Sequence, residues 1–217
     1  MKLIASLLIA AALVAPALSH ANEPAAPAAK ADLAKGEATY NAICAGCHGA
    51  DGNSGAPTNP KLAQQHPDYL VKQLQEFKSG KRANAIMMGM AAGLSDADMK
   101  NVAAWLGSKT SAPNFAKEKD LVVLGERIYR GGVAERQIAA CAGCHSPTGA
   151  GIPSQYPRLA GQHADYTVAQ LNAFREHGNK GAGQNVGRGN SAQMSGVAAK
   201  LNDREIKAVA DYVAGLR

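Results

Sequence analysis

The stretch Cys44-Ala45-Gly46-Cys47-His48 recurs 97 positions later as Cys141-Ala142-Gly143-Cys144-His145. Two thiols three positions apart can form thioether bonds to the two vinyl groups on one edge of a porphyrin, and the adjoining imidazole can bind its iron. All four cysteines of the chain belong to these two motifs. The motifs therefore predict two covalently bound haem c groups, attached through Cys44, Cys47, Cys141 and Cys144, with His48 and His145 as iron ligands.

Paired cysteines with this spacing also occur in four-thiolate zinc sites, in redox-active disulfides and in structural disulfide frameworks. A zinc site does not need a histidine directly after each second cysteine, and its cysteine pairs usually lie much closer together in the sequence than 97 positions. A thioredoxin-like motif needs a strand followed by a helix, and the sequence around these motifs predicts none. The repeated Cys-x-x-Cys-His pattern favours haem.

The first 21 residues have the pattern of a secretory signal peptide. Lys2 precedes an apolar run from Leu3 to Leu18, and Ser19-His20-Ala21 has the small residues typical of a cleavage site. The alternative is a membrane anchor, but the run contains Pro16 and is shorter than the ~20 residues that span a bilayer. We expect export to the periplasm and a mature chain that begins near Asn22, with a low-complexity lead-in over residues 22–31.

The chain carries a formal charge of +6, from 23 basic and 17 acidic side chains. Removal of Lys2 with the signal peptide would lower the charge to +5, and two haem groups would add four propionates. The holoprotein would thus be near neutral, and the sequence has no patch that interleaves basic and aromatic residues. We therefore expect no binding to nucleic acid.

An internal duplication organises the mature chain. At the offset of 97, residues 60–77 match residues 157–174 at eleven positions, among them both Gln-His pairs at 65–66 and 162–163. We expect a first haem domain over residues 32–107, a linker over 108–119 and a second haem domain over 120–217. No segment alternates between apolar and polar residues as strands do, so the predicted fold class is all-α.

Three helices are predicted in each copy. The first covers residues 32–43 and, in the second copy, 121–129; the middle one begins after Pro67 and, in the second copy, near Tyr166. The last begins at N-cap residues within the segments Leu94–Asp98 and Leu201–Glu205. The first helices carry Gly36 and Gly125 at equivalent positions, and a glycine inside a helix costs roughly 1 kcal/mol. We expect these glycines to lie against Trp105 and Tyr212 of the last helices.

The second copy has one methionine, Met194, seven positions before Leu201, and Met87 lies seven positions before Leu94. This registration favours Met87 over Met88 and Met90 as an iron ligand opposite histidine. A thioether ligand stabilises ferrous iron and raises the reduction potential. His66 and His163 are also paired by the repeat, but a capping or surface role is favoured for them because each haem already has a methionine.

The second copy carries insertions after Tyr129 and in the loop around residues 177–190. The segment Gly187–Ala192 matches the glycine pattern of dinucleotide-binding loops. It follows no predicted strand, so we interpret it as part of a flexible loop.

Pro60 and Pro157 each follow the haem histidine by twelve residues, which resembles class I c-type cytochromes. In those proteins the proline carbonyl accepts a hydrogen bond from the ligating imidazole. The whole mature chain resembles the cytochrome c4 family in its two haem motifs, its Pro-x-Leu-Ala segments at 60–63 and 157–160, and its two Gln-His pairs. One departure is Gln64, where the family more often has glycine, as at Gly161 of the second copy.

The resemblance implies two tandem all-helical class I domains, related by a pseudo-two-fold axis, with haem propionate edges at their interface. It implies a periplasmic electron carrier rather than an enzyme, sometimes loosely membrane-associated, which takes electrons from a quinol-oxidising donor and delivers them to a terminal cytochrome oxidase. Two alternatives stay open. One is the electron-transfer subunit of a sulfide or other dehydrogenase complex, and the other is a dihaem peroxidase-like enzyme, which would need an open iron site.

Overall fold

The computed structural model describes residues 30–180 and 188–217. The predicted signal peptide, most of the lead-in and the middle of the loop at 177–190 lie outside these ranges. Residues 31–217 form one compact unit. Within the described ranges, no helix combines the length and the hydropathy needed to cross a bilayer.

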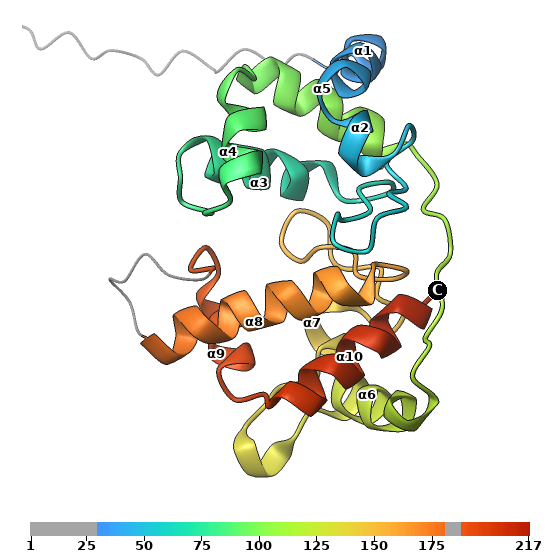
Figure 1. Cartoon of the computed structure of the whole chain (residues 1–217), viewed down its shortest axis with the longest axis vertical. Coiled ribbons are helices and arrows are strands. Elements are labelled where there is room, and N and C mark those ends of the chain that lie inside the picture. The colour runs from blue at the N-terminus through green and yellow to red at the C-terminus, as the bar shows by residue number, and fades with distance from the viewer. Residues whose placement is uncertain (1–29, 181–187) are drawn as a thin grey trace, which may run out of the picture. The chain divides into compact units, whose positions relative to one another are not determined.

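The described residues form two series of five α-helices in the same order (Figure 1). The predicted all-α fold is confirmed, and the only strand-like pairing among these residues is two isolated β-bridges. The first half contains α1 (Leu33–Ile43), α2 (Ala45–His48), α3 (Pro67–Lys78), α4 (Ala85–Ala92) and α5 (Asp96–Gly107). The second half contains α6 (Lys119–Gly131), α7 (Ala142–His145), α8 (Ala164–Lys180), α9 (Ala192–Ala198) and α10 (Asp203–Gly215), with a short 3-10 helix η1 (Ala134–Arg136) between α6 and α7.

The first and last helices of each half pack together through the predicted glycines. A Cβ atom on Gly36 of α1 would lie 2.2 Å from the carbonyl oxygen of Asn101 and 3.1 Å from Cβ of Trp105, both on α5. A Cβ atom on Gly125 of α6 would lie 2.2 Å from the carbonyl oxygen of Ala208, on α10. The prediction is confirmed, and the reason is that the two backbones approach too closely for any side chain at these positions.

Both last helices begin with a capping box, as predicted. Ser95 accepts a hydrogen bond from the backbone of Asp98, whose carboxylate accepts one in return; Asn202 and Glu205 form the same pair at the start of α10. The caps place the apolar faces of α5 and α10 over the two cores. The side chains with the lowest exposure in these cores include Tyr40, Met99, Leu106, Tyr129, Ile128, Ile206 and Val213.

Residues 108–118 connect the halves without a helix or strand and are hydrogen-bonded to both of them. Asn53 of the first half hydrogen-bonds to Thr110 and Ala112. The backbone amides of Lys117 and Glu118 donate to the two carboxylate oxygens of the buried Asp211 on α10. The connection is therefore fixed at both ends.

Gln64 and Gly161 both have a left-handed backbone, with φ of 61° and 72°. This conformation costs a residue with a side chain about 1–2 kcal/mol. Glycine avoids that strain, but its greater conformational entropy in the unfolded chain offsets part of the gain in stability. We expect Gln64→Gly to raise the free energy of unfolding by about 0.5–1 kcal/mol, measured by denaturant unfolding. Gly161→Ala, the matched change in the second half, should lower it by about 1 kcal/mol. A loss of stability in Gln64→Gly would instead mean that the hydrogen bond from Ser111 to the Gln64 side chain matters more than the backbone strain.

Candidate haem sites

The two motif histidines are held in the same way, each at the end of a four-residue helix. His48 ends α2 and His145 ends α7, and both are buried, at 7% and 5% exposure. Nδ1 of His48 lies 2.9 Å from the carbonyl oxygen of Pro60, and Nδ1 of His145 lies 3.0 Å from that of Pro157. A carbonyl oxygen can only accept, so Nδ1 carries the proton and Nε2 of the neutral ring has a free lone pair.

The Nε2 atoms are available to bind a metal. Nε2 of His145 is buried and has no hydrogen-bond partner among the residues that the structure describes. Burial lowers the pKa of both histidines, and the hydrogen bond to proline only partly opposes this shift. Both rings are therefore neutral at pH 7. A buried, neutral imidazole with an unpaired nitrogen fits an axial ligand of haem iron.

The four thiols are free of disulfides. Cys44 and Cys141 are half-buried against the two cores, and Cys47 and Cys144 are exposed. Burial raises the pKa of Cys44 and that of Cys141 to about 11, so both thiols are protonated at pH 7. Free thiols beside an available imidazole are what the attachment of a haem by thioether bonds requires.

A buried tyrosine holds the residue after each histidine. The hydroxyl of Tyr40 donates to the carbonyl of Gly49 at 2.6 Å, and that of Tyr129 donates to the carbonyl of Ser146 at 2.7 Å. These tyrosines come from α1 and α6, four residues after the glycines of the helix contacts. The packing of the first and last helices is thereby linked to the position of each haem histidine.

Met87 and Met194 occupy equivalent positions in α4 and α9. The backbone amide of Met87 donates to the N-cap side chain of Asn84, and that of Met194 to the N-cap side chain of Ser191. Both methionines are half-buried, whereas Met88 and Met90 are exposed at 38% and 47%. Met194 also packs against the second core together with Cys141.

His66 and His163 were expected to have capping or surface roles, and this expectation is wrong for both side chains. His66 occupies the N-cap position of α3, but its side chain makes no capping bond. Instead, Nε2 of His66 hydrogen-bonds to the carbonyl of Ala150 at 2.9 Å, and Nε2 of His163 to that of Ser54 at 2.8 Å. Each histidine therefore binds the loop after the haem motif of the other half.

Two buried arginines that sequence reasoning did not single out also join the halves. Arg82 donates to Tyr166 at 3.0 Å and to Gln170 at 2.8 Å; Arg188 donates to Tyr69 at 3.1 Å and to Gln73 at 2.8 Å. Their exposures are 8% and 7%. The tyrosines and glutamines are paired by the repeat, so the contacts are reciprocal, as at a pseudo-two-fold axis.

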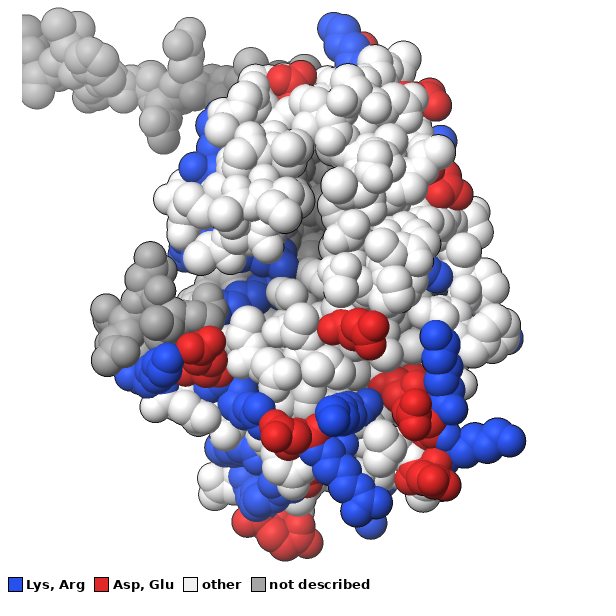
Figure 2. All heavy atoms as spheres, in the orientation of Figure 1, with Lys and Arg blue, Asp and Glu red and all other residues white. Residues whose placement is uncertain are grey.

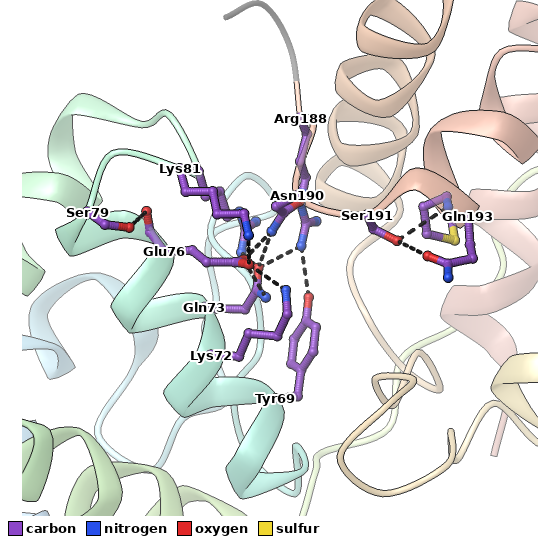
Figure 3. A network of polar contacts seen from close by, with 12 residues as sticks. Tyr69, Lys72, Gln73, Glu76, Ser79, Lys81, Arg188, Asn190, Ser191 and Gln193 are labelled. Carbon is purple, nitrogen blue, oxygen red and sulfur yellow. Dashed lines mark hydrogen bonds and ion pairs between the residues drawn. The ribbon is translucent and has the colours of Figure 1, made fainter. Parts of the chain in front are cut away.

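Figure 3 shows the part of this network around Arg188 and Asn190, which reach α3 of the first half. Asn190 donates to the Glu76 carboxylate at 2.5 Å, and Lys72 binds the same group. Burial would raise the pKa of Glu76, but the hydrogen bonds from Lys72 and Asn190 outweigh it and the pKa lies below the usual value. The predicted flexible loop is therefore wrong at this end, because interactions with the other half fix Arg188 and Asn190.

The charge of this network suits a haem with anionic propionates. Among the described residues, no carboxylate forms an ion pair with either Arg82 or Arg188. The side-chain partners of these arginines are tyrosine, glutamine and asparagine oxygens and the rings of Phe77 and Phe174. Two buried guanidinium groups whose hydrogen-bond partners are all uncharged are costly. Together with the free thiols and the available imidazoles, these groups provide the donors that two haem c groups need.

Comparison with known proteins agrees with this geometry. The Cytochrome c family model matches twice, over residues 33–110 and 124–217. Cytochrome c4 of Pseudomonas aeruginosa is 42% identical over 216 residues, covering 99% of this chain and 98% of the relative. A protein of Stutzerimonas stutzeri named thiosulfate dehydrogenase electron acceptor is 40% identical over 80% of this chain and 78% of its own length.

A solved structure shares the fold of both halves. The crystal structure of reduced recombinant cytochrome c4 from Pseudomonas stutzeri superimposes with a TM-score of 0.78 at 41% identity and covers 86% of this chain and 100% of that one. The two family matches correspond to the two haem motifs, so two haem c groups are the cofactors. This chain belongs to the cytochrome c4 family, and it is a dihaem electron-transfer protein.

Proposed function

We propose that this chain carries single electrons between respiratory partners in the periplasm, toward a terminal cytochrome oxidase. The observation that carries the proposal is that each half offers a locked, neutral histidine and one half-buried methionine. Iron with both axial positions filled by protein has no site for a substrate. Such a centre is suited to electron transfer.

The ligand set that we propose is His48 and Met87 for the first haem and His145 and Met194 for the second, with thioether bonds from Cys44, Cys47, Cys141 and Cys144. The equal N-cap geometry of Met87 and Met194 and the greater exposure of Met88 and Met90 support this set. When bound, each haem supplies one iron that changes between the ferrous and ferric states.

The protein's part in this function is to keep its ligands still. The proline carbonyls hold the imidazole rings, the tyrosine hydroxyls hold the residues that follow them, and the N-caps hold the first turns of α4 and α9. A ligand set that does not move when the charge of the iron changes keeps the reorganisation small. The activation free energy of each electron transfer is then low.

We propose export through the signal peptide of residues 1–21, since c-type haem in Gram-negative bacteria is normally attached after export. The donor would be a quinol-oxidising membrane complex, and peripheral association with the membrane would bring the carrier close to it. N-terminal sequencing of the mature periplasmic protein should begin near Asn22.

The surface offers two kinds of contact for partners. On the face shown in Figure 2, Lys and Arg side chains gather over the second half, intermixed with Asp and Glu, and the surface of the first half is largely uncharged. The uncharged helix α4 exposes Ile86, Met88 and Met90 at 69%, 38% and 47%. These residues lie around Met87, so we propose α4 as the face where a partner approaches the first haem.

A second candidate function comes from the relative in Stutzerimonas stutzeri that is named as the electron acceptor of thiosulfate dehydrogenase. Under this alternative, the same dihaem chain would take electrons from a sulfur-oxidising dehydrogenase. The two functions differ in the donor and share the haem chemistry.

Rates of electron transfer should distinguish these donors. We expect the reduced holoprotein to be oxidised by membranes that contain a terminal oxidase, at a rate that saturates with its concentration and is abolished by cyanide. Reduction by a purified quinol-oxidising complex should be at least about tenfold faster than reduction by a thiosulfate dehydrogenase. The opposite ratio would favour the second candidate, and no oxidation by the membranes would contradict the first.

A further inference from the structure

The proline that accepts the hydrogen bond from each haem histidine is followed by a residue bound to the other half. The backbone amide of Lys61, next to Pro60, donates to Oε1 of Gln162 at 2.9 Å, and Nε2 of Gln162 donates to the carbonyl of Lys61 at 2.9 Å. The Gln162 side chain thus hydrogen-bonds to both the backbone amide and the backbone carbonyl of Lys61. Lys61 and Gln162 are both buried.

The same contact occurs in the opposite direction. The backbone amide of Arg158, next to Pro157, donates to Oε1 of Gln65 at 2.8 Å, and Nε2 of Gln65 donates to the carbonyl of Arg158 at 2.9 Å. Each glutamine oxygen also accepts from the backbone amide of the following histidine, at 3.0 Å in both halves. This local bond orients the amide, so that the glutamine is a rigid partner.

The histidines add a second contact to each loop. Nε2 of His163 donates to the carbonyl of Ser54, and the hydroxyl of Ser54 donates to the carbonyl of Cys47 at 3.2 Å. On the other side, Nε2 of His66 donates to Ala150, and the next residue, Gly151, donates its amide to the carbonyl of His145 at 2.9 Å. The contacts therefore extend from one half to the haem motif of the other.

We propose that each half positions the histidine of the other half's haem. Gln162 acts on His48 through the segment of Pro60, and His163 acts on the same haem motif through Ser54. Gln65 acts on His145 through the segment of Pro157, and His66 acts on it through Ala150 and Gly151. The inference rests on the proposed role of His48 and His145 as iron ligands. A firm bond from Nδ1–H to the proline carbonyl raises the basicity of the imidazole, and a more basic ligand favours ferric iron. These four residues are positioning residues that lower the potential of the opposite haem.

The test is Gln162→Leu in the holoprotein, with Gln65→Leu as the reciprocal variant. In Gln162→Leu, we expect the ferrous-to-ferric ratio of the first haem at a fixed potential to rise about threefold, which corresponds to about 28 mV for one electron. The second haem should stay within the error of the titration. Gln65→Leu should give the reverse. Gln75→Leu, an exposed glutamine on α3, is the control and should change neither haem.

The hydrogen bond itself can be followed by nuclear magnetic resonance with ¹⁵N-labelled histidine. In Gln162→Leu, the Nδ1–H signal of His48 should shift and exchange faster with solvent, while that of His145 stays unchanged. Equal shifts of both haems in each variant, or no shift of the opposite haem, would overturn the inference while the electron-carrier function stands. If Gln162→Leu yields no holoprotein, His163→Leu tests the same loop through Ser54.

A failure of the proposed ligand set would give a different result. It would appear in the unmodified protein, as haems whose spectra show that His48 or His145 is not bound to iron. The variants are interpreted only after that measurement, so the two failures are distinguishable.

Discussion

Replacing Met194 with alanine is expected to remove the sulfur ligand of the second haem and to lower its reduction potential on the order of 0.2 V, within the span of about 0.8 V that axial ligands cover. The thioether stabilises ferrous iron, so its loss favours the ferric state. The oxidised protein should lose half of the weak charge-transfer absorption that marks a sulfur–iron bond. Met87→Ala should have the same effect on the first haem.

Met90→Ala provides the matched control, because Met90 lies in the same short helix as Met87 but is 47% exposed. It should leave both spectra and both potentials unchanged. A six-coordinate second haem with an unaltered spectrum in Met194→Ala would show that another residue is the ligand. An effect of Met90→Ala comparable with that of Met87→Ala would mean that the alignment of the two copies identifies the wrong methionine in the first half.

Gly125→Ala is expected to lower the free energy of unfolding by about 3 kcal/mol, the upper part of the range for overpacked cores. The new Cβ atom would lie 2.2 Å from the Ala208 carbonyl oxygen and 2.8 Å from Cβ of Tyr212, so α6 and α10 must move apart. The Ala208 carbonyl is part of the backbone of α10, so it cannot move aside as the end of a flexible side chain could. Denaturant unfolding of the holoprotein, followed by helical circular dichroism, measures the change.

Gly131→Ala is the control for Gly125→Ala, since it lies in the same helix and its added Cβ would meet no atom within 4 Å. It should leave stability unchanged or raise it by up to about 1 kcal/mol, because alanine has the higher helix propensity. Equal losses in both variants would show that the helix contact at Gly125 is not the cause. Gly36→Ala should behave as Gly125→Ala does, through α5.

The sequence was sufficient to predict the features that depend on local chemistry and on the repeat. The capping boxes at Ser95 and Asn202 follow from side chains three residues apart, and such pairs form wherever the helix begins. The glycine contacts could be predicted because Gly36 and Gly125 occur at equivalent positions in two helices that have no local reason to contain glycine. The bonds from His48 and His145 to their prolines agree with the resemblance to class I cytochromes.

The contacts between the halves could not be predicted in the same way. A glutamine that pairs with backbone 101 positions away has no periodic pattern, and the identity of Gln65 with Gln162 indicated a shared role but not its partner. Arg82 and Arg188 were missed because loops of different length precede Met87 and Met194, so the repeat does not align them. The prediction of a flexible loop at Arg188 failed because a glycine-rich segment suggests mobility. In the structure, the buried Arg188 guanidinium donates to several acceptors, and these hydrogen bonds fix the segment.

The reciprocal contacts of Gln65 and Gln162 constrain how the two copies can diverge after a gene duplication. A change in either glutamine disturbs a loop of the opposite copy, so neither copy can be altered there by itself. The chain still has the same Gln-His pair in both copies, whereas Lys72 and Glu76 have Ala169 and Ala173 at the matching positions. Divergence has thus proceeded where only one copy uses a residue, and a recombinant that joins two first halves would lack the Glu76 partner Asn190 but keep both glutamine contacts.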